Sequence, residues 1–318
     1  LYLNLPPRHR GTPEAYRARL RGLLKEAAGQ ASEKDIAAIE DYFDKSFDWT
    51  GRSVAVFSSV ADELWRGATF AGPFRSSTIY VGSKPFLMPL ASLMDTYGAY
   101  SVALVDQQVL RMFHVHLGEL VASKKLEGEE VKRIKAGGGM PGRSRGDDVS
   151  SVTEAAVRSN LKTFAEALAA FCKHYKTEHI LLGGAEPALN AFEDELAQPW
   201  KDCVQGRFNI QRRASDSEVL QRSLEVMLSR AEEREAQLVE MVQTLAAKGT
   251  NGAVGLADTL KAADEGRVQT LLLVDGAVAP DVAGPAIAHV LDCGGSVEFV
   301  SSTSPLAAHD GIGALLRY

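Results

Sequence analysis

The sequence predicts a multidomain α/β protein, and three observations support this fold class. The chain has 318 residues. A single hydrophobic core rarely supports a chain of this length, so two or three domains are expected. Strand-like and helix-like segments alternate across residues 98–212, which is typical of an α/β unit. From residue 213 a long amphipathic segment is followed by helix, strand, helix and strand patterns. Domains are therefore predicted at 1–97, 98–212 and 213–318.

The first predicted domain is α/β because it combines both kinds of periodicity. Segments 1–5, 53–59 and 77–82 have the residue types and alternation of strands. Apolar residues spaced three and four apart across 13–47 predict helical structure. The stretch 84–94 mixes proline with apolar residues, so we expect the first domain to end there.

The second predicted domain begins with a β-hairpin. Two apolar runs within 100–120 flank a plausible turn at 106–108. Helical spacing follows at about 150–176. A short buried strand at 179–184 and a short helix at 186–196 complete the pattern.

The third predicted domain starts with a long amphipathic helix at 215–249. Ser215 or Asp216 is a suitable N-cap, and Gly249 is a suitable C-terminal stop. Two helix–strand pairs follow with roughly parallel pairing, at 255–276 and 283–302.

Composition limits the classes of partner. The net charge is −6, so contact with a polyanion requires a local basic patch. The three cysteines are scattered without metal-ligand spacing, which indicates a reduced compartment and no metal site. No apolar run reaches the ~18 residues of a membrane span. We therefore expect a cytoplasmic protein with no membrane or DNA partner and no cofactor.

The stretch GGGMPGRSRG at 137–146 is the most unusual local feature. Five of its ten residues are glycine, so it is unsuited to the interior of a helix or strand. It is either a connector or a loop that contacts an anion. The window 124–145 holds seven basic and three acidic residues, a net charge of +4. Basic side chains around exposed backbone N–H groups favour phosphate contact.

Residue patterns alone do not indicate an enzyme. Gly137, Gly139 and Gly142 match a dinucleotide-binding pattern, and the same stretch nearly matches a P-loop with arginine in place of lysine. Both motifs need a core strand before them, and here the preceding stretch is charged. His114 and His116 place two imidazoles on one strand face but lack a third ligand nearby. No catalytic or metal-binding residue is predicted.

Three segments resemble a known family. GIGALLRY at 311–318 and TLKAADEGRVQTLLLVDG at 259–276 resemble the third domain of archaeal and eukaryotic release factor 1 and Pelota. VALVDQQVLRMFHVHLGEL at 102–120 resembles the hairpin that opens their second domain. The resemblance covers about 98–318 and points to the bacterial homologues of this family. It implies an RNase H-like second domain and an L7Ae-like third domain.

The resemblance implies a role for the glycine-rich stretch. The second domain of the release factors mimics the tRNA acceptor arm, and its Gly-Gly-Gln loop reaches the peptidyl-transferase centre. Here Met140 follows three glycines, and no glutamine occurs between Gln108 and Gln198. The first domain also lacks an Asn-Ile-Lys-Ser stretch. The expected protein is a factor that occupies the ribosomal A site without releasing peptide, as hibernation factors such as Balon do.

The implied partners are the 70S ribosome, through 23S and 16S rRNA, and elongation factor Tu as a candidate. The predicted rRNA-binding loop consists of Gly137, Gly138, Gly139, Met140, Pro141, Gly142, Arg143, Ser144 and Arg145, with Lys124, Lys125, Lys132, Arg133 and Lys135 flanking it.

Two alternatives stay open. A peptidyl-tRNA hydrolase or rescue factor would need loop N–H groups to orient water and Arg143 to stabilise the oxyanion. A binding module unrelated to the ribosome would instead use the helix 215–249 as its docking surface.

Overall fold

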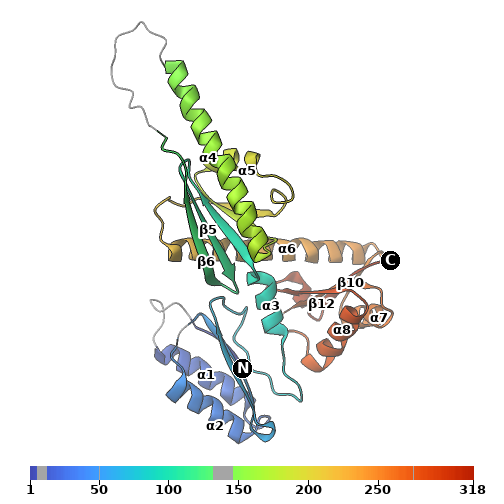
Figure 1. The fold of residues 1–318 in the computed structure, drawn as a ribbon. Helices are drawn as coiled ribbons and strands as arrows, with labels where there is room; N and C mark the ends of the chain where they lie inside the picture. Colours follow the sequence, from blue (N-terminus) through green and yellow to red (C-terminus); the bar gives the residue numbers. More distant parts are fainter. Residues whose placement is uncertain (6–12, 50, 132–145, 275) are drawn as a thin grey trace. The chain divides into compact units, whose positions relative to one another are not determined.

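The computed structural model describes the chain except for residues 6–12, 50, 132–145 and 275 (Figure 1). The described strands form three sheets in a mixed α/β protein, as predicted. The chain divides into two compact units. One unit is 97–227, and the other joins 1–96 to 228–318. Among the described residues, no helix is both long and apolar enough to cross a membrane.

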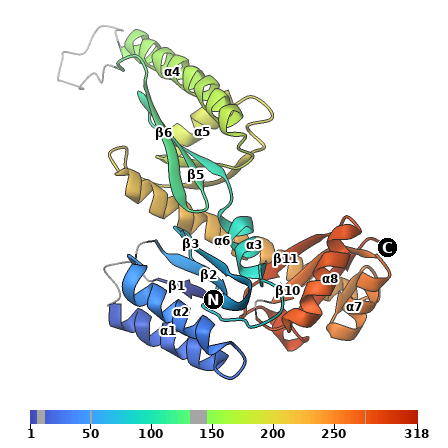
Figure 2. The same cartoon turned by 60° about the horizontal axis from the view of Figure 1, so that its bottom comes forward.

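The N-terminal sheet is antiparallel and carries two helices on one face (Figure 2). Tyr16, Leu20 and Phe43 from the helical segments share one core with Leu3 and Val54 from the sheet. In chain order, the elements are β1 (Tyr2–Asn4), α1 (Pro13–Ala27), α2 (Glu33–Asp41), the π-helical turn Tyr42–Ser46, β2 (Ser53–Ser59) and β3 (Leu64–Phe70).

Two predictions for this region need correction. The predicted strand at 77–82 is wrong, because only Thr78 forms a bridge, to Tyr2. The third strand of the sheet is instead β3, which pairs with all of β2. This strand was not predicted because most of its side chains are exposed, so it lacks the apolar pattern of a buried strand. The helical stretch at 13–47 is real but divided: Gly29 adopts a φ of +88° in the turn after α1, and Ser32 caps α2.

The sheet of the unit 97–227 mixes antiparallel and parallel strands in the order β6-β5-β4-β7-β8. The predicted hairpin, both predicted helices and the strand near 180 are confirmed. β6 and β8 were not predicted, and β6 is a charged edge strand that buries only part of one face. The elements are β4 (Tyr100–Val105), β5 (Val109–His116), β6 (Glu119–Glu127), α4 (Gly146–Tyr175), β7 (Ile180–Gly184), α5 (Glu186–Glu195) and β8 (Val204–Phe208).

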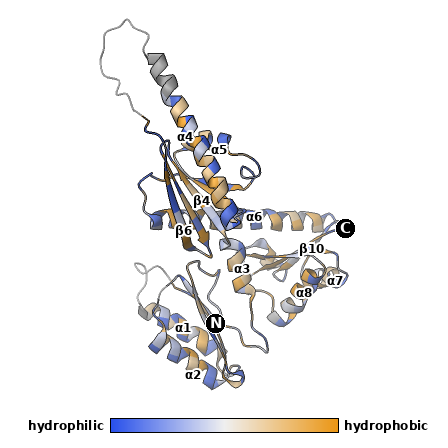
Figure 3. Ribbon diagram, viewed as in Figure 1, coloured by the Kyte–Doolittle hydropathy of each residue, from blue (hydrophilic) through white to orange (hydrophobic). Residues whose placement is uncertain are grey.

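Alternating residues of β5 are buried in two different cores. Leu110 and Met112 pack in the core that includes Phe164 and Leu168 of α4, which runs along the sheet (Figure 1). Phe113 is buried in the opposite core, with the first part of α6. Because side chains alternate along a strand, Arg111 shares the face of Phe113. Figure 3 shows hydrophilic and hydrophobic positions mixed along both α4 and α6, as expected of helices with one buried face.

The C-terminal sheet has the order β11-β10-β12-β9, and the predicted parallel pairing of β10 with β11 is confirmed. The long helix α6 is also confirmed: Ser215 and Glu218 form a reciprocal capping box, and Gly249 has a φ of +64° just beyond the helix. The elements are α6 (Asp216–Ala247), β9 (Gly252–Val254), α7 (Leu256–Asp264), β10 (Val268–Val274), α8 (Pro280–Asp292), β11 (Ser296–Val300) and β12 (Ile312–Leu316).

The stretch that was expected to end the first domain forms α3 (Met88–Tyr97), and one unit boundary falls at its end. The other boundary, at 227/228, falls inside α6. The division into 1–97, 98–212 and 213–318 stays a prediction.

Candidate nucleic-acid interface

Two of the predicted RNA-binding residues have described positions. Lys124 and Lys125 are exposed on the edge strand β6. The remaining predicted residues lie outside the described part of the chain: Lys132, Arg133, Lys135, Gly137, Gly138, Gly139, Met140, Pro141, Gly142, Arg143, Ser144 and Arg145.

Strand register places one of these lysines beside a second cation. Lys125 lies directly opposite Arg111 of β5, whereas Lys124 lies opposite Met112 and points to the other face. Like charges that face each other across two strands repel. Arg111 and Lys125 therefore produce a local positive field that favours a nearby anion.

Arg111 also brings a distant basic segment to the sheet. Its Nη1 donates to the carbonyl oxygen of Ala214 at 2.6 Å, and its Nη2 donates to Asp216 Oδ1 at 2.6 Å. The guanidinium lies 5.1 Å from the ring centroid of Phe113, and only 18% of the side chain is exposed. These contacts hold the segment before α6, which carries Arg212 and Arg213, against β5.

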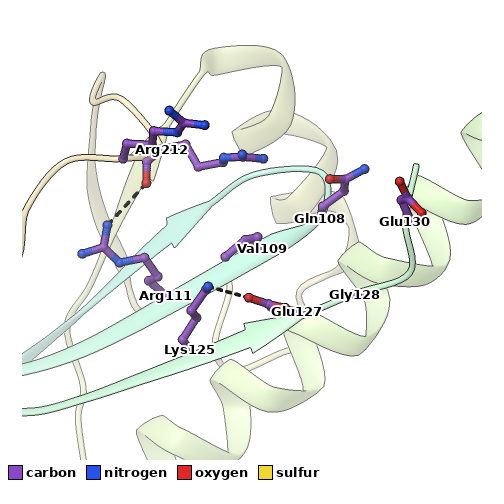
Figure 4. Close-up of a pocket in the computed structure, with 9 residues that line it drawn as sticks. Gln108, Val109, Arg111, Lys125, Glu127, Gly128, Glu130 and Arg212 are labelled. Carbon is purple, nitrogen blue, oxygen red and sulfur yellow. Dashed lines mark hydrogen bonds and ion pairs between the residues drawn. The ribbon is translucent and has the colours of Figure 1, made fainter. Parts of the chain in front are cut away.

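Together these elements form an open groove of about 590 Å³ (Figure 4). The turn after β4, the strands β5 and β6, and the segment before α6 all contribute to it. Four cations and two carboxylates are among its lining residues, which are Gln108, Val109, Arg111, Lys125, Glu127, Gly128, Glu130, Arg212 and Arg213. We call this site the basic groove.

The cations of the basic groove are only partly neutralised. Lys125 pairs with Glu127 at 2.5 Å, and its hydrogen bond and charge hold the pKa of the Glu127 carboxyl below its ordinary value. Arg212 makes a long contact of 3.5 Å with Asp106. Arg213 is exposed and has no ion pair or hydrogen bond to any described residue. Exposed ion pairs contribute little stability, so a polyanion can compete for these cations.

The lining favours phosphates over bases. No aromatic side chain lines the groove within the described chain, and base-stacking platforms in nucleic-acid sites are usually aromatic. Arginine and lysine contacts to phosphate position a nucleic acid without reading its sequence. The groove therefore suits sequence-independent contact with a phosphodiester backbone.

The paired histidines of β5 do not share an environment. His114 is buried, stacks on Tyr175 at 4.4 Å between ring centroids, and contacts Thr177 Oγ1 at 3.3 Å. Burial, and then the charge of His116, lowers the pKa of the His114 imidazole. His116 is exposed. In the described residues, no three histidine, cysteine, aspartate or glutamate side chains gather where they could hold a metal ion.

Sequence reasoning missed three arginines and Gln108 in the groove. Arg111 interrupts the apolar run that opens β5, which was a usable signal for a functional position. Arg212 and Arg213 adjoin the predicted start of a helix. Their proximity to β5 depends on contacts across about a hundred residues, which local patterns do not carry.

The sequence of this same region matches a known family. Residues 85–228 match Bacterial archaeo-eukaryotic release factor family 10, and the whole basic groove lies within the matched segment. This segment of the chain is therefore similar to the bacterial archaeo-eukaryotic release factor family. The predicted resemblance is thereby confirmed.

The fold is similar to that of a translation termination-like factor of known structure. Dom34 of S. cerevisiae, a translation termination-like factor, is 14% identical with a TM-score of 0.50, covering 84% of this chain and 79% of Dom34. The archaeal termination factor aRF1 is 16% identical with a TM-score of 0.30, covering 100% and 92%. Archaeal Pelota, in a model of its ribosome-bound state with ABCE1, is 17% identical with a TM-score of 0.46, covering 84% and 77%. No curated protein matches this sequence.

Proposed function

We propose that this protein is a ribosome-binding translation factor that occupies the A site as a tRNA mimic and does not catalyse peptide release. The observation that carries the proposal is the basic groove, which lies within the family segment of a chain whose net charge is −6. Local positive charge in an acidic protein directs binding to a polyanion through one surface. Ribosomal RNA is the polyanion that the match to this family suggests.

The absence of catalysis is proposed from the sequence. Met140 follows the glycines at the place where the release-factor family has its glutamine. The resemblance implies that this glutamine helps to position the hydrolytic water, so its absence argues against hydrolysis. A factor that binds without hydrolysis blocks the A site, which suits ribosome protection during dormancy or stress. The proposed partners are the 70S ribosome, through 23S and 16S rRNA, and elongation factor Tu. The RNase H-like and L7Ae-like descriptions of the second and third domains belong to the same proposal.

The test is co-sedimentation of the full chain with vacant 70S ribosomes at several salt concentrations. We expect binding that weakens steeply with salt. Alanine at Arg212 and Arg213 should reduce the slope of log affinity against log salt by about 1.5, because each lost phosphate contact removes about 0.7–0.9 from it. The matched control is Arg222→Ala, which removes an exposed arginine of α6 that pairs with Glu225 at 2.8 Å outside the groove.

A competition experiment and a peptide-release assay distinguish the proposed function from its alternatives. Displacement of the bound chain by aminoacyl-tRNA would support the A site as its location. Release of a labelled peptide from peptidyl-tRNA on the same ribosomes would instead favour the hydrolase. Absence of the chain from the ribosome pellet, with and without elongation factor Tu, would contradict the proposed function.

A further inference from the structure

Side-chain hydrogen bonds fix the backbone where the chain leaves β6. Regular pairing of β5 with β6 ends at Val109 and Glu127. One more backbone hydrogen bond follows, from Gly128 N to the carbonyl oxygen of Gln108 at 2.8 Å. Residues 129–131 belong to no strand. Their backbone groups must therefore be satisfied by side chains or by water.

Asn160 of α4 supplies those contacts. Its Oδ1 accepts a hydrogen bond from Glu129 N at 2.8 Å. Its Nδ2 donates to the carbonyl oxygens of Glu129 at 3.0 Å and Gln107 at 3.1 Å. All three partners are backbone atoms, and only 3% of Asn160 is exposed. One buried amide thus connects α4, the turn between β4 and β5, and the exit from β6.

Gly128 fits this arrangement because it has no side chain. A Cβ atom at this position would collide with the side-chain amide of Asn160. The restriction comes from the close approach of Asn160, since Gly128 does not adopt a left-handed backbone conformation. Asn160 and Gly128 therefore act as a matched pair.

A second side chain fixes the same exit. Gln108 Nε2 donates to the carbonyl oxygen of Val131 at 3.0 Å, and Val131 is buried. Gln108, Gly128 and Glu130 line one end of the basic groove (Figure 4). The hydrogen bonds of Asn160 reach the neighbours of all three residues. The backbone of that end of the groove is therefore fixed from the α4 side of the sheet.

We propose that Asn160 is a positioning residue for the basic groove: it does not contact RNA but fixes the end of the groove that the turn and the strand exit form. The inference rests on the proposed function, because it assumes that the groove binds an RNA phosphate backbone. Fixed binding groups lose less conformational freedom when a ligand binds, and this raises affinity. Without Asn160, Glu129 and Glu130 are free to move, and their carboxylates can approach the groove cations and compete with phosphate.

The first experiment compares Asn160→Ala with Leu168→Ala in the full chain. Leu168 is fully buried in the core on the same helix, so its replacement controls for general destabilisation. Amide hydrogen exchange should show lost protection over 128–131 in Asn160→Ala alone. The affinity for vacant 70S ribosomes should fall about tenfold in Asn160→Ala, which corresponds to about 1.4 kcal/mol. Leu168→Ala should bind like the wild-type protein at a temperature where both variants are folded.

Two further variants test the mechanism. Asn160→Asp keeps an acceptor for Glu129 N, but its carboxylate faces the carbonyl oxygens of Glu129 and Gln107 where the amide donated, so its affinity should fall at least as far as that of Asn160→Ala. Gly128→Ala should weaken binding in the wild-type background, where the added Cβ displaces the Asn160 amide. In the Asn160→Ala background the same change should have little further effect, because the colliding amide is gone.

The outcomes are distinguishable. If Asn160→Ala loses protection over 128–131 but binds ribosomes like the wild-type protein, the positioning role is wrong. Equal effects of Gly128→Ala in both backgrounds would also contradict it. If the wild-type chain binds no ribosomes, the proposed function fails, and the proposal for Asn160, which rests on it, falls too. Should Asn160→Ala not fold, Gly128→Ala in the wild-type background still decides the question, since binding like that of the wild-type protein would contradict the positioning role.

Discussion

Two grooves of similar size differ in what they can bind. The basic groove has a volume of about 590 Å³, and a second groove of about 600 Å³ lies between the last part of α6 and the segment after β11. The second groove is lined by three carboxylates and no cation, and by the apolar side chains of Val239 and Val300. We call it the acidic groove. Size alone therefore does not assign a ligand, because the sign of the lining charge excludes RNA from one groove and favours it in the other.

The carboxylates of the acidic groove are not equivalent. Glu235 is buried and forms an ion pair with Arg75, whose Nη1 lies 3.0 Å from Glu235 Oε2. Glu232 and Glu240 are exposed and have no ion pair with any described residue. The negative field of this groove therefore comes mainly from these two exposed side chains. In the basic groove, the comparable unpaired charge is that of Arg213.

Charge reversal in the basic groove should have the largest effect on ribosome affinity. Replacing both Arg212 and Arg213 by glutamate converts the basic groove to net negative charge. We expect ribosome affinity at moderate salt to fall about a hundredfold, because two phosphate contacts are replaced by two repulsions. Glu232→Lys with Glu240→Lys is the matched control and should change affinity by no more than about twofold. A gain in affinity from the Glu232→Lys, Glu240→Lys variant as large as the loss from the arginine variant would mean that overall charge, rather than the basic groove, controls binding.

Removal of Arg111 should have an intermediate effect on ribosome affinity and should also lower the stability of the fold. Its hydrogen bonds to Ala214 and Asp216 hold the basic segment against β5, so Arg111→Ala should destabilise the unit 97–227 by about 2 kcal/mol. Urea unfolding measures that loss, and ribosome co-sedimentation measures the accompanying loss of affinity. Arg111→Lys should recover little of either, because a lysine ammonium does not reproduce the planar set of donors of a guanidinium. Full recovery by lysine would show that only the charge of Arg111 matters.

The elements that could be predicted from the sequence are those determined by residues close together in the chain. The helix α6 was predicted because its capping box and the glycine after its last turn are sequence neighbours of its periodic pattern. The hairpin of β4 and β5 was predicted because two apolar runs flank a short turn. β6 was missed because it is an edge strand in which apolar residues are few.

The candidate site was only partly predictable for a related reason. Lys125 stood out because it belongs to a basic window in the sequence. Its neighbours Arg111 and Arg213 come from other segments, and only the strand register and long-range hydrogen bonds bring them together. Asn160 resembled any polar residue of a helix until its backbone partners were seen. Sequence patterns reveal a charge, whereas the fold determines which charges act together.

The smallest expected effect on ribosome affinity comes from Glu127, the carboxylate that pairs with Lys125. Glu127→Gln removes a negative charge from the basic groove and frees Lys125, so ribosome affinity should rise about threefold. Acid should not reproduce this gain above pH 5. Lys125 lowers the pKa of Glu127 in the folded chain. The Glu127 carboxylate therefore stays charged until the pH falls below the ordinary pKa of a glutamate side chain. A rise in wild-type affinity between pH 7 and pH 5 that Glu127→Gln abolishes would show that Glu127 protonates earlier than this pairing allows.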